Sequence, residues 1–168
     1  MSLTMHQASV PAFQRTLRAL SAILDKTEAH ATAGKIEPAA LLSARLFPDM
    51  FALTRQVQLT CDFAKNGAAR LSGVEAPKFE DTEASFTDLR ARIAATLAFI
   101  EGIKPSQIDG TEERQVTLKI GGSDRNFTGR DYLLFFVLPN FYFHATTAYD
   151  ILRHNGIQLG KRDFMGMN

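Results

Sequence analysis

The stretch LFPDMFALTRQVQLTCDFAKNGAARL, residues 46–71, carries an apolar seam whose positions alternate four and three residues apart. The seam consists of Met50, Thr54, Val57, Cys61, Ala64, Ala68 and Leu71. Positions with this spacing lie along one side of an α-helix, and an unbroken seam is typical of a helix packed in a bundle. Pro48 suits a first helical turn and Asp49 favours its positive end, so we predict a helix over residues 48–71.

The single cysteine of the chain, Cys61, lies in the middle of this seam. It cannot form an internal disulfide, which fits a reducing compartment. Cys61, Ala64 and Ala68 are small and would let a partner helix approach closely. Because a free cysteine most often behaves as a small buried hydrophobe, we predict that Cys61 fills the core rather than acting as a reactive thiol.

Three further segments show helical periodicity. Apolar residues recur every three or four positions and predict helices over residues 4–31, 82–103 and 128–154. The loop LSGVEAPKFED, which begins at Leu71, contains glycine and proline and would carry the chain across the bundle. The pattern predicts an all-α protein, a four-helix bundle in one domain over residues 1–168.

Two local signals refine this architecture. Ser85 with Asp88, and Thr128 with Asp131, have the spacing of capping boxes at helix starts. The segment QVTLKIGGSDRNF alternates apolar and polar residues around two glycines, which is typical of a hairpin. We predict a small β-hairpin around residues 115–127, just before the last helix.

Composition limits the classes of function. The chain has 168 residues, of which 45% are hydrophobic, so it can bury a real core. Nineteen basic and eighteen acidic side chains nearly balance, which gives no electrostatic footprint for nucleic acid or an anionic membrane. The start of the chain lacks a leader pattern, and no stretch has the apolar length of a membrane span. We expect a cytoplasmic protein that binds neither nucleic acid nor membrane.

The segment FYFHATTAYDILRHNG, residues 141–156, places His144 among aromatic and aliphatic residues. At 100° per residue, Asn140 and His144 share a narrow lane with apolar positions, and the rest of the helix is apolar, so both should face inward. Pro139 would bend or reset the helix one turn earlier. We predict that His144 borders a small internal cavity, with hydrogen-bonding amides from Asn140 and from Gln56 on the second helix.

Burial without a paired carboxylate should lower the pKa of His144 and keep its ring neutral at pH 7. Two interpretations stay open: a polar handle for a ligand, or a core histidine satisfied by a neighbouring helix. Tyr149 and Arg153 lie four residues apart and would present a phenol and a guanidinium at a pocket mouth, or cap and solvate the helix end. The sequence contains no nucleophile elbow, phosphate loop, histidine-glutamate zinc motif or paired cysteine motif.

The segments SARLFPDMFALTRQVQ and LPNFYFHATTAYDILRHNGIQLGKRDF resemble an uncharacterised bacterial family. That family, a domain of unknown function, is grouped with the DinB/YfiT-like metalloenzyme superfamily. The resemblance implies a bundle in up-down-down-up order with a long crossing connection between the second and third helices. It also implies homodimers, and in some members thiol-dependent S-transferase activity with a divalent metal held by three histidines.

The resemblance transfers these ligands only in part. Aligning the helix end on Arg153 and Gly156 places the second histidine of the superfamily on His144 and the first on Asn140. The third should come from residues 47–71, which contain no histidine; Asp49, Gln56 and Asp62 are the nearby substitutes. One imidazole with amides is a poor donor set for zinc or nickel. His144 is therefore the only matching ligand position, and we predict no tightly held metal; a divalent metal belongs only to the transferase alternative below.

Three functions are open, the first from the residue patterns and the other two mainly from what the resemblance implies. The preferred prediction is a small-ligand binding module with a polar pocket at His144. The first alternative is a metal-dependent thiol S-transferase with a degenerate metal site. The second alternative is a structural homodimer without a ligand, whose polar lane specifies packing. The expected partners are a second copy, bound through outer helix faces, and a small molecule.

Overall fold

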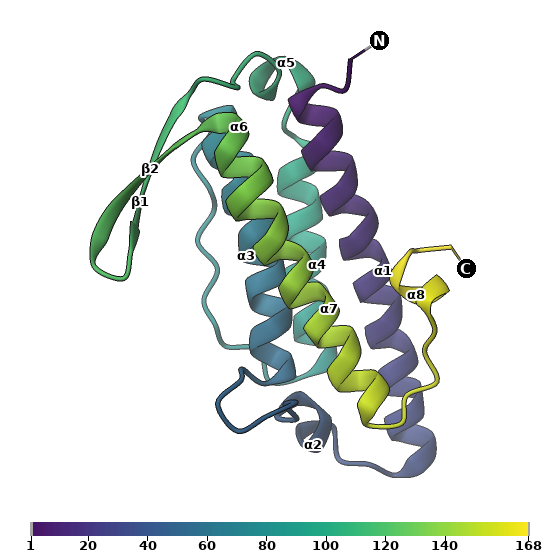
Figure 1. Ribbon diagram of the computed structural model, residues 1–168. Helices are drawn as coiled ribbons and strands as arrows, with labels where there is room; N and C mark the ends of the chain where they lie inside the picture. The colour runs from purple at the N-terminus through teal and green to yellow at the C-terminus, as the bar shows by residue number, and fades with distance from the viewer. Residues whose placement is uncertain (1, 168) are drawn as a thin grey trace.

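The computed structural model describes residues 2–167 and shows four long helices side by side, with a hairpin projecting near one end (Figure 1). The elements in chain order are α1 (Met5–Gly34), α2 (Pro38–Leu42), α3 (Leu53–Ser72), α4 (Phe86–Glu101), α5 (Pro105–Ile108), β1 (Gln115–Ile120), β2 (Ser123–Thr128), α6 (Gly129–Tyr132), the π-helical segment η1 (Leu133–Val137), α7 (Leu138–His154) and α8 (Lys161–Phe164). Among these, no helix is both long and apolar enough to cross a membrane.

The order of the long helices agrees with the predicted topology. In Figure 1, α1 runs from the top of the bundle to the bottom, α3 returns, and a long loop leads back so that α4 runs parallel to α3. α7 then runs parallel to α1. This is the up-down-down-up bundle, and the loop over residues 73–85 is its crossing connection.

The hairpin is confirmed with almost the predicted bounds. β1 pairs with β2 in an antiparallel register from Gln115 opposite Thr128 to Ile120 opposite Ser123. Gly121 and Gly122 have φ of 59° and 84°, the left-handed conformation that a two-residue hairpin turn requires. Within residues 2–167 these two strands form the whole sheet, so the hairpin is a ribbon rather than a second core layer.

The start of α3 corrects the sequence prediction. We expected a helix from residue 48, but α3 begins at Leu53, and the amide of Met50 donates to the carbonyl of Phe47 in a turn. The amide of Leu53 donates to the carbonyl of Ala44, which holds the ends of this loop together. Pro48 therefore lies in a turn, and Met50 is half-buried rather than part of the core seam. The short helix α2 before this loop was not predicted.

The last helix is continuous but contains a π-helical segment that was not predicted from the sequence. Pro139 lacks an amide hydrogen, so it cannot donate to the carbonyl one turn earlier, and the wider turn of η1 precedes it. Thr128 caps the amide of Asp131, as predicted. The amide side chain of Asn140 donates to the carbonyl of Phe136 at 2.7 Å. The π-helical segment therefore ends directly before the turn that contains Pro139, one turn before His144.

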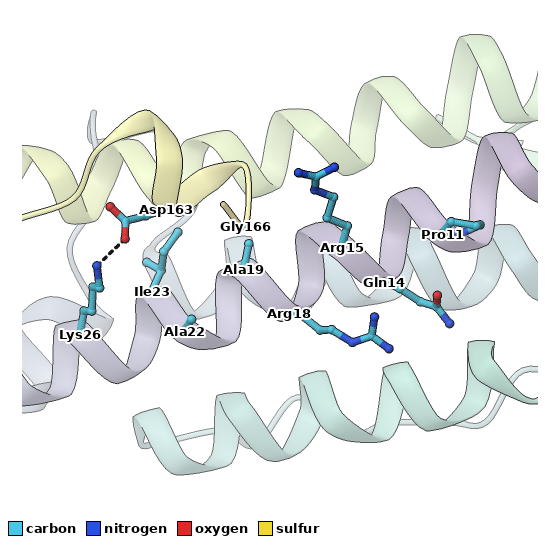
Figure 2. A pocket seen from close by; sticks show the side chains of 10 residues that line it. All are labelled: Pro11, Gln14, Arg15, Arg18, Ala19, Ala22, Ile23, Lys26, Asp163 and Gly166. Atoms are coloured by element: carbon cyan, nitrogen blue, oxygen red, sulfur yellow. Dashed lines mark hydrogen bonds and ion pairs between the residues drawn. The ribbon is translucent and has the colours of Figure 1, made fainter. Parts of the chain in front are cut away.

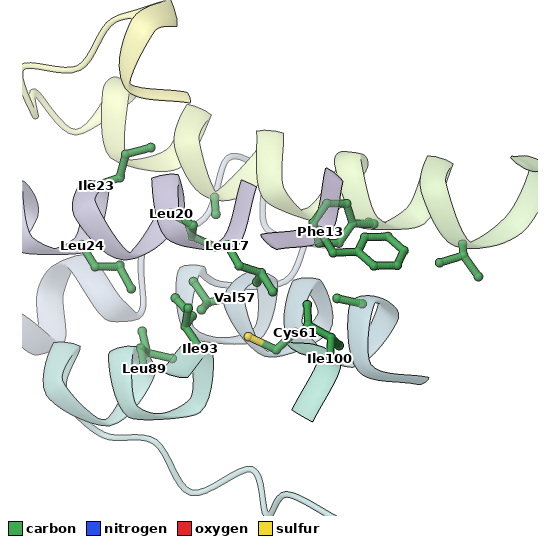
Figure 3. Close-up of a cluster of buried hydrophobic side chains, with 14 of the residues drawn as sticks. Phe13, Leu17, Leu20, Ile23, Leu24, Val57, Cys61, Leu89, Ile93 and Ile100 are labelled. Atoms are coloured by element: carbon green, nitrogen blue, oxygen red, sulfur yellow. The ribbon is translucent and has the colours of Figure 1, made fainter. Parts of the chain in front are cut away.

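The core lies between α1, α3, α4 and α7. Figure 3 shows Phe13, Leu17 and Leu20 of α1 meeting Val57 and Cys61 of α3, together with side chains of α4. Cys61 is 0% exposed, and burial raises the pKa of its thiol to about 12. The core position predicted for Cys61 is confirmed.

Candidate functional site

The predicted contact between His144 and Gln56 is present where α3 and α7 pack together. Nδ1 of His144 lies 2.8 Å from Oε1 of Gln56. The histidine is 8% exposed and the glutamine 1%, so this polar pair is enclosed by the two helices. Its geometry is that of a well-formed hydrogen bond between neutral side chains.

The surroundings of Gln56 determine which nitrogen of His144 carries the proton. Nε2 of Gln56 donates to the backbone carbonyl of Phe51 at 3.1 Å, and a carbonyl can only accept. The amide is therefore oriented with Oε1 toward His144. Because Oε1 also only accepts, Nδ1 of the imidazole must donate, and in the neutral ring the lone pair lies on Nε2.

Nε2 of His144 is the free side of the ring. It makes no hydrogen bond to any residue in the described range 2–167, and it is not among the fully buried polar atoms left unpaired there. It therefore keeps some contact with solvent. The site presents one oriented acceptor whose opposite nitrogen is anchored by Gln56.

Burial lowers the pKa of His144, and the positive charge of Arg55 lowers it further. Both effects disfavour the imidazolium form. The ring is neutral near pH 7, so its lone pair is available to a donor. The direction agrees with the shift predicted from the sequence.

Aromatic rings continue from His144 toward the hairpin. Phe63 stacks on the imidazole with centroids 5.5 Å apart, and Phe143 meets it edge-on at 5.3 Å. Phe136 lies 5.8 Å from Phe63 and 5.5 Å from Phe127 of β2. Phe63, Phe136 and Phe127 are half-buried. We call these four phenylalanines and His144 the aromatic row.

The other predicted site residues do not converge on His144. Asn140 donates to Phe136 within its own helix. Tyr149 packs edge-on against Phe164 of α8 at 5.8 Å, and Arg153 is exposed in the last turn of α7. In the described part of the chain, neither has a hydrogen bond or ring contact with His144. The cavity expected at His144 remains a prediction; cavities of 470 and 460 Å³ lie elsewhere, along α1 and beside the crossing loop.

A buried ion cluster between α3, α4 and the crossing loop was not predicted. Arg92 of α4 is 5% exposed and lies 2.9 Å from Asp62, 2.8 Å from Glu83 and 3.1 Å from Asp81. Lys65 is also buried, with its ammonium 3.3 Å from Asp62. These ion pairs attach the crossing loop to both helices. They also leave Asp62 engaged on the α4 side of α3.

The environment of the cluster keeps its charges in place. Burial raises the pKa of Glu83, but hydrogen bonds from Arg92 and Gln58 outweigh it, and the net pKa is lowered. The ammonium of Lys65 lies over the ring of Phe79, 4.3 Å from the centroid of that ring. The sequence offered one signal for this cluster: Arg92 shares the inner side of α4 with the buried residues Leu89, Ile93 and Thr96.

The residues near His144 do not fit the metal that the superfamily implies. Within residues 2–167, no group of three or more His, Cys, Asp or Glu side chains could hold an ion. The oxygen of Gln56 accepts from His144, Asp62 is bound to Arg92 and Lys65, and Asp49 is exposed in the loop before α3. One imidazole nitrogen remains, and divalent transition metals favour more nitrogen or sulfur ligands than that.

The fold and the histidine-bearing helix pair define a DinB-like four-helix bundle. The crystal structure of a DinB family member protein from Shewanella denitrificans matches with a TM-score of 0.91 and 41% sequence identity, over 96% of this chain and 91% of that chain. The chain belongs to the family described as a domain of unknown function, DUF1993, whose sequence model matches residues 5–165. None of the curated proteins matches it.

Proposed function

We propose that this protein binds a small molecule at the aromatic row and that the molecule donates a hydrogen bond to Nε2 of His144. The single observation that carries the proposal is the hydrogen bonding of the ring: Gln56, held by the carbonyl of Phe51, accepts from Nδ1, so the lone pair lies on Nε2, which has no partner within residues 2–167. An anchored acceptor beside apolar rings is the usual composition of a small-molecule site.

The surroundings favour a ligand with a flat apolar body. Phe143 beside the imidazole is 56% exposed, and Phe51, whose carbonyl holds Gln56, is also 56% exposed. Exposed phenylalanine rings gain most by stacking on an apolar or aromatic group. The ligand class is therefore a flat aromatic molecule that carries one neutral hydrogen-bond donor, a hydroxyl or a thiol.

The thiol-transferase alternative uses the same lone pair. A neutral imidazole with a lowered pKa can accept a proton from a bound thiol, which would make His144 a general base. The donor set described above supports no metal-dependent form of this chemistry. A thiol ligand that binds without reacting would favour the binding module over the enzyme.

The test uses p-cresol, p-thiocresol and toluene, which share an aromatic body but differ in the donor. Saturable shifts at His144, Phe63 and Phe143 in NMR spectra are expected with p-cresol, and toluene should bind at least tenfold more weakly. His144→Phe should reduce p-cresol binding to that of toluene, whereas His154→Phe, at an exposed position on the same helix, should leave it unchanged. Equal affinity for p-cresol and toluene in the wild type would refute the proposal.

We propose further that a second copy of the chain covers the outer side of η1 and α7. Phe135 is 73% exposed, and Leu134 and Tyr142 are exposed beside it. At about 200 Å² per large apolar side chain, these exposed fractions amount to roughly 300 Å² of apolar surface, somewhat over a third of one partner's share of a standard interface.

Light scattering at micromolar concentration should give the mass of a dimer, and Phe135→Asp should give a monomer. Ile120→Asp, at an exposed apolar position on the hairpin, is the control and should remain dimeric. A wild type that stays monomeric throughout the concentration series would exclude this assembly.

A further inference from the structure

A cavity that shares no residue with the His144 site lies along the outer side of α1. Its volume is 470 Å³, within the range of small-ligand pockets. Figure 2 shows its lining residues on successive turns of α1, with Asp163 and Gly166 of the C-terminal segment closing one side. Nothing in the proposed function uses this cavity.

The floor of the cavity is apolar because α1 presents small side chains there. Ala19 and Ile23 are buried beside the C-terminal segment, and Ala22 lies one turn from Lys26 on the outer side. A larger side chain at Ala22 would project into this space. The floor therefore accommodates a short apolar chain without any rearrangement of the bundle.

The wall formed by the C-terminal segment is held in place by two contacts. Nε of Arg15 donates to the carbonyl of Met165 at 2.8 Å, and the ammonium of Lys26 lies 2.5 Å from Asp163 (Figure 2). Gly166 has φ of +60° and lies close to α1, so a Cβ atom at this position would be 3.6 Å from Cβ of Ala19. The segment is thus fixed against α1, and the cavity is a feature of the folded chain.

The charges around the cavity do not cancel. Arg15, Arg18 and Lys26 are positive; Asp163 faces Lys26, and Glu101 lies 2.7 Å from Arg18. Arg15 has no carboxylate partner among the described residues, and its two terminal nitrogens are uncommitted because only Nε is bonded. Among the residues of the described range, one positive charge therefore remains, on the side chain whose planar fork matches a carboxylate.

We propose that this cavity binds a small amphipathic monoanion, a carboxylate with a short apolar chain. The carboxylate pairs with the terminal nitrogens of Arg15, and the chain lies over Ala19, Ala22 and Ile23. Arg15 also lines a second cavity of 430 Å³ with Tyr142 and Met165, so its guanidinium can be reached from both sides. We assign the ligand to the cavity beside Ala22, because that cavity also contains Lys26 and Asp163, whose ion pair holds the C-terminal segment.

The test uses the full chain and sodium octanoate below the concentration at which it forms micelles, with 1-octanol as the neutral probe of the same length. Isothermal titration should show one saturable site for octanoate and at least tenfold weaker binding of octanol. Arg15→Gln should weaken octanoate binding at least tenfold. Arg130→Gln, at an exposed arginine paired with Asp131, is the matched control and should not change it.

Two substitutions of alanine by leucine test where the apolar chain of the ligand lies. Ala22→Leu fills the cavity and should abolish binding, whereas Ala12→Leu, on the other side of Arg15, should leave it intact. Both variants retain every ion pair, and their circular dichroism reports whether they fold. Equal binding of octanol and octanoate, unchanged binding by Arg15→Gln, or loss in Ala12→Leu but not in Ala22→Leu would overturn the proposal.

Discussion

Replacing Gln56 with leucine tests the orientation of the His144 ring. The substitution removes the hydrogen bond to the carbonyl of Phe51 and the acceptor for Nδ1 of His144. Each bond contributes about 1 kcal/mol, and leaving a buried donor unpaired costs about 1–3 kcal/mol. Phe51 is exposed and its carbonyl can be hydrated, so the main loss is at Nδ1. Leucine recovers about 1 kcal/mol through apolar burial. We expect the free energy of unfolding to fall by about 2 kcal/mol.

The measurement has two parts. Urea denaturation followed by circular dichroism gives the change in stability. The ¹⁵N chemical shifts of the imidazole, in protein labelled at histidine, report which nitrogen carries the proton. The wild type should show the Nδ1–H form at His144. In Gln56→Leu no acceptor holds that proton, so the Nε2–H form should become populated, because Nε2 is the nitrogen that meets water.

Gln58→Leu is the matched control. Gln58 is also buried on α3, but it donates to Glu83 and accepts from Arg55 rather than contacting His144. It should lose a similar amount of stability and keep the Nδ1–H form. A wild type in the Nε2–H form, or the same tautomer change in both variants, would refute the assignment of the free lone pair.

Three other outcomes are expected. The pKa of His144 should lie below the ordinary histidine value in an NMR titration. Between the folded-state pKa and the higher unfolded-state pKa, the unfolded chain binds more protons than the native one, so the free energy of unfolding should rise with pH. His144→Gln should remove this pH dependence. A raised pKa would contradict this. Gly129→Ala should lower the free energy of unfolding by about 3 kcal/mol, because the new Cβ would lie 2.1 Å from the carbonyl oxygen of Thr111, whereas Gly102→Ala, with its nearest contact at 3.4 Å, should change it by less than about 1 kcal/mol. Cys61 should react with a thiol reagent only after denaturation, and rapid stoichiometric labelling of the native protein would show that the core opens.

Apolar periodicity predicted the long helices because burial of one face is a property of each segment alone. The seam through Val57, Cys61 and Ala64 and the hairpin glycines are local patterns of this kind. The start of α3 was wrong because Pro48 fits a helix and a turn equally well. The contact that decides between them joins Leu53 to the carbonyl of Ala44, in a loop whose path depends on α2.

The candidate site was also predicted where it depends on helix periodicity and missed where it depends on loops. His144 and Gln56 were predicted to meet because each faces inward on its own helix and few buried amides were available. The orientation of Gln56 could not be predicted, because it depends on the backbone carbonyl of Phe51 in a loop assigned to helix. The partners of Arg92 were also out of reach, because Asp62 and Glu83 come from a neighbouring helix and from an irregular loop with no periodicity.

The geometry of α3 explains why a carboxylate on this helix does not complete a site at His144. Gln56 and Asp62 are six residues apart, so their directions differ by about 120° around the helix axis. Gln56 contacts α7 and Asp62 contacts Arg92 of α4, as that angle requires. The acid nearest in sequence thus serves the crossing loop, while the position facing His144 is an amide that fixes the ring without neutralising a charge. The helix pair leaves His144 with one oriented lone pair and an apolar surround, which suits recognition of a neutral donor better than capture of a cation.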